Sequence, residues 1–88
     1  MNERRLERYL KALANRRRLA ILSYLKRDPA ANVGGVAHEI GLSFRATSRH
    51  LLLLERVGIL DKTQRNKEVF YRVSEKLDDF VCKILLQI

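Results

Sequence analysis

Apolar residues in the first two thirds of the chain recur every three or four positions, which is the spacing of one face of an α-helix. Asparagine or serine stands just before three of these segments and is suited to capping the first backbone N–H groups of a helix. The pattern predicts helices over residues 3–13, 16–26 and 33–40, and a fourth from Ser43 to Gly58.

The segment LSFRATSRHLLLLERVGIL, residues 42–60, carries the strongest functional signal. Thr47, Leu51 and Leu54 form its buried stripe, and Gly58 suits the left-handed turn that often ends a helix. The first turns carry polar and basic side chains on other faces: Arg45, Ser48, Arg49 and His50. A helix with a buried back and a basic front near its start is typical of one that enters the major groove of DNA.

The elements around this helix predict a helix-turn-helix followed by a hairpin. Gly41 and Leu42 make a short turn between the third and fourth helices. After Gly58 the apolar period becomes two, which predicts strands over residues 59–65 and 68–73. Val69, Tyr71 and Val73 should face the core and Phe70 and Arg72 the outside, while Asn66 suits a positive φ in the turn. The tip, with Arg65 and Lys67, can lie along DNA phosphates or reach the minor groove.

The last predicted helix, residues 75–88, has an apolar stripe of its own. With the first helix also apolar on one side, this stripe indicates a two-fold homodimer. The alternative is that it packs only on its own domain. The predicted interface residues are Leu6, Leu10, Leu77, Phe80, Val81, Ile84, Leu85 and Ile88.

These elements give one domain over residues 1–88, mostly α with a small β-hairpin: five helices and a two-stranded antiparallel wing. The net charge of +8 indicates a polyanionic partner such as double-stranded DNA. Residues 1–27 hold nine Lys or Arg against two acids, and residues 43–73 hold seven against three. The positive charge therefore lies on the predicted folded elements, although a solvated basic surface would give the same count.

Several classes of protein are not expected. The single cysteine, Cys82, excludes an internal disulfide and is expected to be a packed or partly exposed thiol rather than a redox sensor. One cysteine and two distant histidines do not make a zinc site, and His38 is expected on the surface. No catalytic group, cofactor motif, membrane span or signal peptide is evident, so we expect a cytoplasmic protein without enzyme activity.

The chain resembles the arsenical-resistance-repressor (ArsR) family of winged helix-turn-helix regulators through the segments KALANRRRLAILSYL, EIGLSFRATSRHLLLLERVGIL and EVFYRV. The resemblance implies a homodimer, built largely from the first and last helices, that binds a palindromic operator and usually represses transcription. It also implies that residues early in the fourth helix contact bases and phosphates. These positions are Phe44, Arg45, Ser48 and Arg49, flanked by Ser43 and His50.

The chain departs from this family in two respects. Many members sense metals through cysteines in the third helix, and others through Asp and His in the last helix. Here the third-helix stretch NVGGVAHEI has no cysteine, and Asp78 and Asp79 have no histidine partner after His50. Family-type metal sensing is therefore not expected. Phe44 and Arg45 are bulky where small polar residues are common, so the chain should read a different operator.

The sequence therefore predicts a dimeric, sequence-specific DNA-binding repressor. Two alternatives remain open at this point. A winged-helix module that docks a protein partner, or an architectural DNA binder without sequence preference, would show much of the same pattern.

Overall fold

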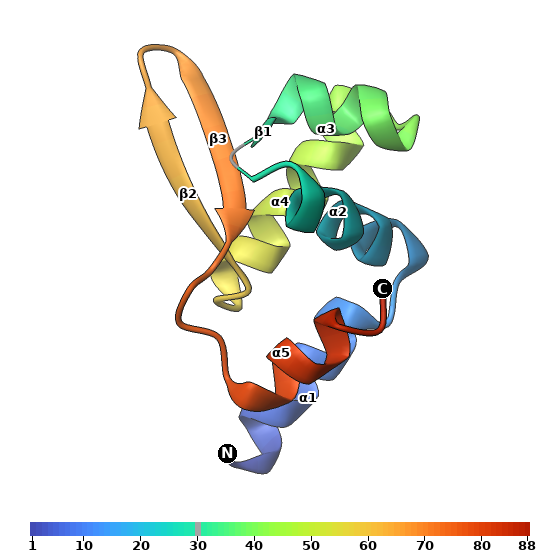
Figure 1. Ribbon diagram of the computed structural model, residues 1–88, viewed down its shortest axis with the longest axis vertical. Coiled ribbons are helices and arrows are strands. Elements are labelled where there is room, and N and C mark those ends of the chain that lie inside the picture. Colours follow the sequence, from blue (N-terminus) through green and yellow to red (C-terminus); the bar gives the residue numbers. More distant parts are fainter. Residues whose placement is uncertain (30) are drawn as a thin grey trace.

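A computed structural model describes residues 1–29 and 31–88 (Figure 1). It confirms five helices and an antiparallel wing. Helices α2, α3 and α4 gather beside the sheet, whereas α1 and α5 lie at the opposite end of the molecule from the wing tip. Within the described part of the chain, no helix has the length and apolarity needed to span a bilayer. The elements in chain order are α1 (Glu3–Leu13), α2 (Arg16–Arg27), β1 (Ala31–Asn32), α3 (Val33–Ile40), α4 (Phe44–Arg56), β2 (Leu60–Arg65), β3 (Glu68–Val73) and α5 (Asp79–Leu85).

Side-chain caps fix where the first four helices begin. The Asn15 side-chain oxygen accepts hydrogen bonds from the backbone N–H groups of Arg17 and Arg18, and Asn2 caps α1 in the same way. Each cap gives a partner to an N–H group that has none within the helix. Gly41 ends α3 with a φ of 67°, a left-handed conformation that glycine adopts without steric cost.

The sheet has three strands in the order β1-β3-β2, all antiparallel. The inward positions predicted along β3 are confirmed, because Tyr71 is buried and Val69 and Val73 pack on the core. Of the two predicted outward residues, Arg72 is exposed, whereas Phe70 is half-buried although it lies outside the core. The strand β1 was not predicted. It contributes only two residues, of which Ala31 pairs with Tyr71, and so short a strand has no readable period.

A single core joins all five helices to the sheet. The stripe of Thr47, Leu51 and Leu54 predicted on α4 is fully buried there, at 0% exposure for each residue. This core holds the back of α4 in place and so decides which of its side chains face solvent. The other core side chains with at most 1% exposure are Ile21, Leu22, Leu25, Val36, Ile59, Leu60 and Val81.

Helix α5 is shorter than predicted, covering Asp79–Leu85 instead of residues 75–88. The Ser74 hydroxyl accepts a hydrogen bond from the Lys76 backbone N–H at 3.1 Å, and Asp78 is extended. A serine side chain competes for nearby backbone groups in this way, so the residues before Asp79 form a turn. Cys82 is exposed on this helix.

The far end of α5 is held by Lys26 of α2. Its ammonium group donates hydrogen bonds of 2.6 Å to the backbone carbonyls of Leu85 and Ile88. A cation at this position offsets the partial negative charge at the C-terminal end of a helix. At the other end of α5, Arg5 of α1 forms a 3.0 Å ion pair with Asp78. Both ends of the short helix are therefore connected to the rest of the domain.

Candidate nucleic-acid interface

The start of α4 presents an open, basic surface. The Ser43 hydroxyl caps the helix by accepting a 3.1 Å hydrogen bond from the Ala46 N–H. Phe44 follows with 63% of its surface exposed, although a large apolar side chain is usually covered. Arg45 and Arg49 are also exposed, and neither forms a hydrogen bond or ion pair within residues 1–29 and 31–88. Their guanidinium donors are available to a ligand.

His50 points toward α2 instead of joining this surface. Its Nδ1 lies 3.4 Å from an Arg18 guanidinium nitrogen, and the ring is half-buried. Burial, followed by the positive charges of Arg18 and Arg17, lowers the pKa of His50 below its usual value of 6.5. His50 therefore packs locally against α2, which is less suited to contacting DNA than an exposed side chain. Ser48, predicted alongside it, is half-buried on α4.

Arg18 links three helices, a role that the sequence did not indicate. Besides approaching His50 on α4, it donates hydrogen bonds to two carbonyls at the end of α1, at 2.6 Å to Ala12 and 2.9 Å to Lys11. Its sequence context, one of three consecutive arginines, shows charge but gives no partner. Helices α4 and α1 are thus connected through one side chain of α2.

The wing tip is shaped as predicted. Asn66 has a φ of 56°, the left-handed conformation expected at the turn. Lys67 is exposed, and the guanidinium carbon of Arg65 lies 5.1 Å from the centroid of the Phe70 ring. This cation–π contact holds Arg65 along the outer face of the hairpin. The two basic residues of the tip therefore differ, since the Lys67 side chain has no partner in the described residues and Arg65 is stacked on Phe70.

The wing is attached to the start of α3 through Asn32. Its side-chain oxygen accepts a 2.7 Å hydrogen bond from the Gly35 N–H, and its side-chain nitrogen donates one of 3.0 Å to Glu68. Beside this contact lies a groove of about 220 Å³ whose lining includes Phe44 of α4 and Lys67 of the wing. The structure thus brings together two predicted contact residues that are far apart in the sequence.

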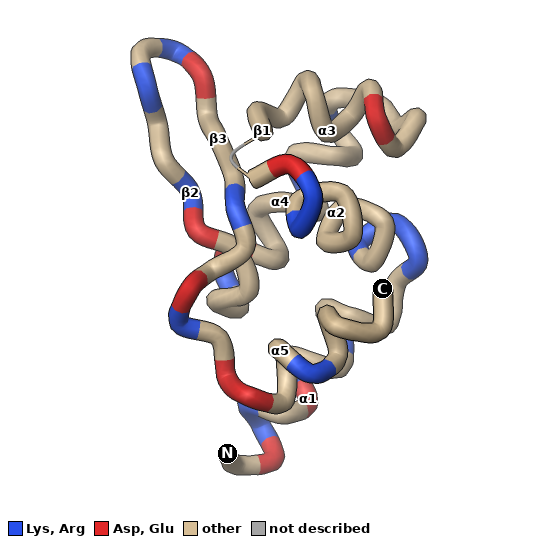
Figure 2. The backbone as a smooth tube through the Cα atoms, in the orientation of Figure 1, with Lys and Arg blue, Asp and Glu red and all other residues tan. Residues whose placement is uncertain are grey.

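The basic residues near this groove lie on α4 and at the wing tip, whereas α3 carries no Lys or Arg. Figure 2 shows Lys and Arg at the wing tip next to an acidic residue, and both acidic and basic residues in the connection from β3 into α5. The net charge of +8 is therefore unevenly placed among the elements, as the sequence predicted.

The predicted dimer residues divide into three groups. Val81 and Leu85 are buried in the protomer's own core, at 0% and 5% exposure, so the stripe does pack in part on its own domain and these two are corrected to core residues. Leu10 and Ile88 are exposed, at 47% and 38%. Leu86 is exposed at 77%. It was not predicted as an interface residue, because the spacing of the apolar stripe favoured its neighbour Leu85. Four residues are half-buried: Leu6, Leu77, Phe80 and Ile84.

The chain matches a known protein family over the segment that contains this surface. The family described as winged helix-turn-helix DNA-binding matches residues 14–61, from the end of α1 to the first residues of β2. This chain belongs to that family. The matched part of this winged helix-turn-helix protein includes α2, the turn at Gly41 and all of α4.

Two relatives have similar sequences. Nodulation protein NolR of Rhizobium meliloti is 43% identical over 77 residues, which cover 88% of this chain and 60% of NolR. Transcriptional activator HlyU of Vibrio cholerae is 42% identical over 65 residues, which cover 74% of this chain and 59% of HlyU. This winged helix-turn-helix protein therefore spans about three fifths of the length of these two relatives.

Solved structures share the whole architecture. The structure of HlyU from Vibrio cholerae has a TM-score of 0.80 at 32% identity. The matched region covers 99% of this chain and 96% of the HlyU chain. The solution structure of Mb0332 from Mycobacterium bovis, described as a homodimeric domain and a possible ArsR-family regulator, has a TM-score of 0.80 at 26% identity. It covers 94% of this chain and 73% of its own.

Proposed function

We propose that this protein is a transcriptional regulator that binds DNA sequence-specifically as a homodimer. The observation that carries the proposal is the open start of α4, where Phe44, Arg45 and Arg49 are exposed beside a wing that ends in Lys67. The buried back of α4 leaves only this face available to a groove. The surface is positive, as a partner with a phosphate backbone requires.

Each exposed side chain suits a different part of a DNA duplex. Arg49 and Arg45 can donate bidentate hydrogen bonds to O6 and N7 of guanine, and an exposed Phe44 suits the methyl group of thymine. Ser43 and Ser48 lie at the edge of this surface and suit phosphate or base contacts. At the wing, Lys67 and Arg65 suit phosphates, and His50 is at most a flanking contributor because it packs toward Arg18.

The dimer follows from the apolar residues at the two ends of the chain. In the described residues, the exposed large apolar side chains other than Phe44 lie either at residues 1–10 or at residues 86–88. Such residues suit a symmetric contact between copies of α1 and of the α5 end. We propose Leu10, Leu86 and Ile88 as its exposed contacts, with Leu6, Leu77, Phe80 and Ile84 at its margin. The Mb0332 domain, described as homodimeric, supports the two-copy state.

A two-fold dimer also predicts the form of the target. In such a dimer the two copies of α4, which we call the reading helices, are related by the two-fold axis. They meet successive major grooves about 34 Å apart, so the operator should be a palindrome. We propose an ArsR-type repressor that does not use that family's metal ligands. The relatives do not share one regulatory sign, since HlyU is named an activator and AntR an antimony-specific repressor.

Selection of binding sites from a random duplex library tests the proposal. We expect enrichment of a palindromic site, with half-site centres about ten base pairs apart. At roughly ten phosphate contacts per dimer, affinity for that site should fall by several powers of ten across a fourfold rise in salt, because condensed counterions are released on binding. Equal affinity for all duplexes would indicate an architectural binder. No binding to DNA, together with a captured protein partner, would indicate a docking module.

A further inference from the structure

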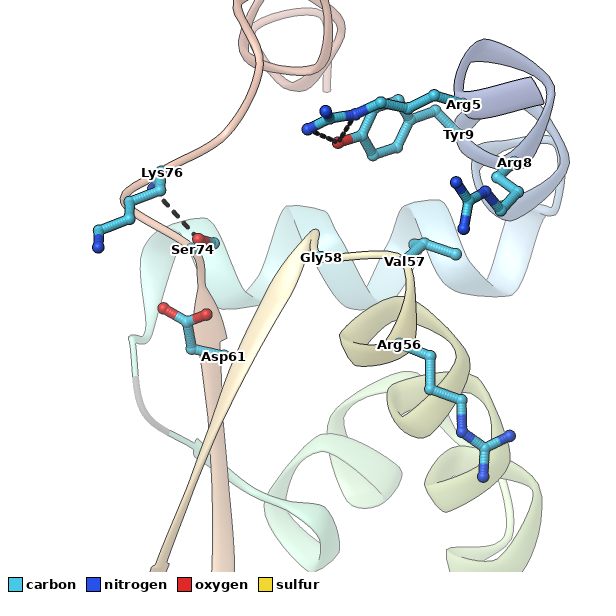
Figure 3. A pocket seen from close by; sticks show the side chains of 9 residues that line it. All are labelled: Arg5, Arg8, Tyr9, Arg56, Val57, Gly58, Asp61, Ser74 and Lys76. Atoms are coloured by element: carbon cyan, nitrogen blue, oxygen red, sulfur yellow. Dashed lines mark hydrogen bonds between the residues drawn. The ribbon is translucent and has the colours of Figure 1, made fainter. Parts of the chain in front are cut away.

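A second positively charged site lies at the base of the wing, away from the exposed start of α4. It is a pocket of about 400 Å³ between α1, the turn from α4 into β2, and the connection from β3 to α5 (Figure 3). Four of its side chains are cationic and one, Asp61, is acidic. The full lining is Arg5, Arg8, Tyr9, Arg56, Val57, Gly58, Asp61, Ser74 and Lys76.

Only one of the four cations is held by the protein. Arg5 donates to the Tyr9 hydroxyl oxygen at 3.3–3.4 Å and forms the ion pair with Asp78. In the described part of the chain, the side chains of Arg8, Arg56 and Lys76 form neither a hydrogen bond nor an ion pair. The lining holds four cations and only one acid, Asp61, so positive charge is in excess and the like charges repel one another.

The pocket is also rich in hydrogen-bond donors. Figure 3 shows Arg5 and Arg8 reaching from α1 toward the turn at Val57 and Gly58, whereas Arg56 extends away from this turn and the Lys76 ammonium group points outward on the opposite side, near Asp61. The Ser74 oxygen already accepts from the Lys76 N–H, so its own proton is left to donate to a ligand. Guanidinium groups bind oxyanions through paired N–H donors, and phosphate suits that geometry.

We propose that this pocket binds a small oxyanion with at least two negative charges, of the phosphate or phosphate-monoester class. Such an anion offsets the excess positive charge of the lining and can accept hydrogen bonds from the guanidinium groups that reach into the pocket. The anion would contact α1, the end of α4, and the connection from β3 to α5. These segments lie between the proposed dimer contact and the proposed DNA-contacting elements, α4 and the wing. The binding itself does not depend on the proposed function, whereas the effect on DNA affinity does.

The binding is tested on the full chain by titrating sodium phosphate at constant ionic strength, made up with sodium chloride, and following backbone amides by NMR. We expect saturable shifts at Gly58, Ser74 and Lys76. An exposed ion pair contributes about 0.2–1 kcal/mol, so R8Q combined with K76Q should weaken phosphate binding by roughly two- to 25-fold. The control R27Q removes an exposed arginine elsewhere and should leave binding unchanged. Shifts that do not saturate, or equal binding by the double variant, would overturn the site.

The regulatory consequence is tested on the selected operator. We expect phosphate to change the operator affinity of the wild-type protein at constant ionic strength, and to change that of the R8Q/K76Q protein less. In phosphate-free buffer the double variant should bind the operator as the wild type does. If it has already lost affinity there, the cations contact DNA and the proposal is wrong. Saturable phosphate binding with no change in operator affinity would refute the coupling.

Discussion

Substitution of Arg49 by alanine isolates the contribution of the reading helix. Arg49 is exposed and has no protein partner in residues 1–29 and 31–88, so its removal should change the free energy of unfolding by no more than about 0.5 kcal/mol. A loss of DNA affinity then reports the contact itself. A bidentate contact with a guanine is worth about 1–3 kcal/mol, and two-fold symmetry applies it twice. The operator complex should therefore weaken by about 2–6 kcal/mol, which is roughly 30-fold to 20,000-fold.

Fluorescence anisotropy with the selected operator and with duplexes changed at one symmetric base pair measures both affinity and preference. We expect the Arg49→Ala protein to lose discrimination at that pair only. If Arg49 touches phosphate instead, all duplexes should weaken together, and the salt slope should fall by about one for each contact. Arg27→Ala is the matched control, because Arg27 is exposed at the end of α2. Unchanged affinity and preference in a folded Arg49→Ala protein would refute the assignment of α4 as the reading helix.

Four further predictions concern the wing, the dimer, the core and pH. Lys67→Ala should weaken binding to all duplexes alike and lower the salt slope by about one per contact, and a sequence-dependent loss in anisotropy would contradict this. Leu10→Glu places charge in the proposed apolar contact, so sedimentation equilibrium should show a monomer; a retained dimer would exclude Leu10 from the interface. Thr47→Val removes a buried hydroxyl that has no partner in the described residues, so urea unfolding should show a gain of about 1–2 kcal/mol, and a loss would show that the hydroxyl is bonded. Because the fold favours neutral His50, stability should fall as pH drops below 6.5, its usual pKa, toward its lowered pKa in the fold; urea midpoints of the His50→Gln protein should fall less, and equal pH slopes would contradict the assignment.

Local chemistry explains why most of the fold was predictable from the sequence. The helices α1 and α3 have the predicted bounds, because a capping asparagine and an apolar stripe act within a few residues of one another. The strand β3 was also predicted correctly, with Tyr71 inward, because its period of two is set by the core on one side. The start of α5 was misplaced because apolar spacing does not show that Ser74 bonds the Lys76 N–H and so favours a turn there.

Features that depend on distant parts of the chain were not predictable. Nothing in the sequence places Arg5, Arg56 and Lys76 around one pocket, since they come from three separate elements. The same holds for β1, whose two residues form a strand only because β3 lies beside them. On α4 the exposure of the arginines could be predicted from the spacing of the apolar residues alone. The contact of His50 with Arg18 could not, because it depends on where α2 lies.

The two hydrogen bonds of Asn32 have a consequence for the shape of the DNA site. One side chain connects the first turn of α3 to Glu68 in the wing, which restrains the wing relative to the helix-turn-helix. If the protein binds DNA as proposed, this contact helps to fix the distance between the bases that α4 would contact and the phosphates that the wing would contact. A base pair inserted within a half-site would shift the DNA backbone by about 3.4 Å relative to the wing. We therefore expect half-sites of one fixed length, in keeping with the single spacing expected between their centres.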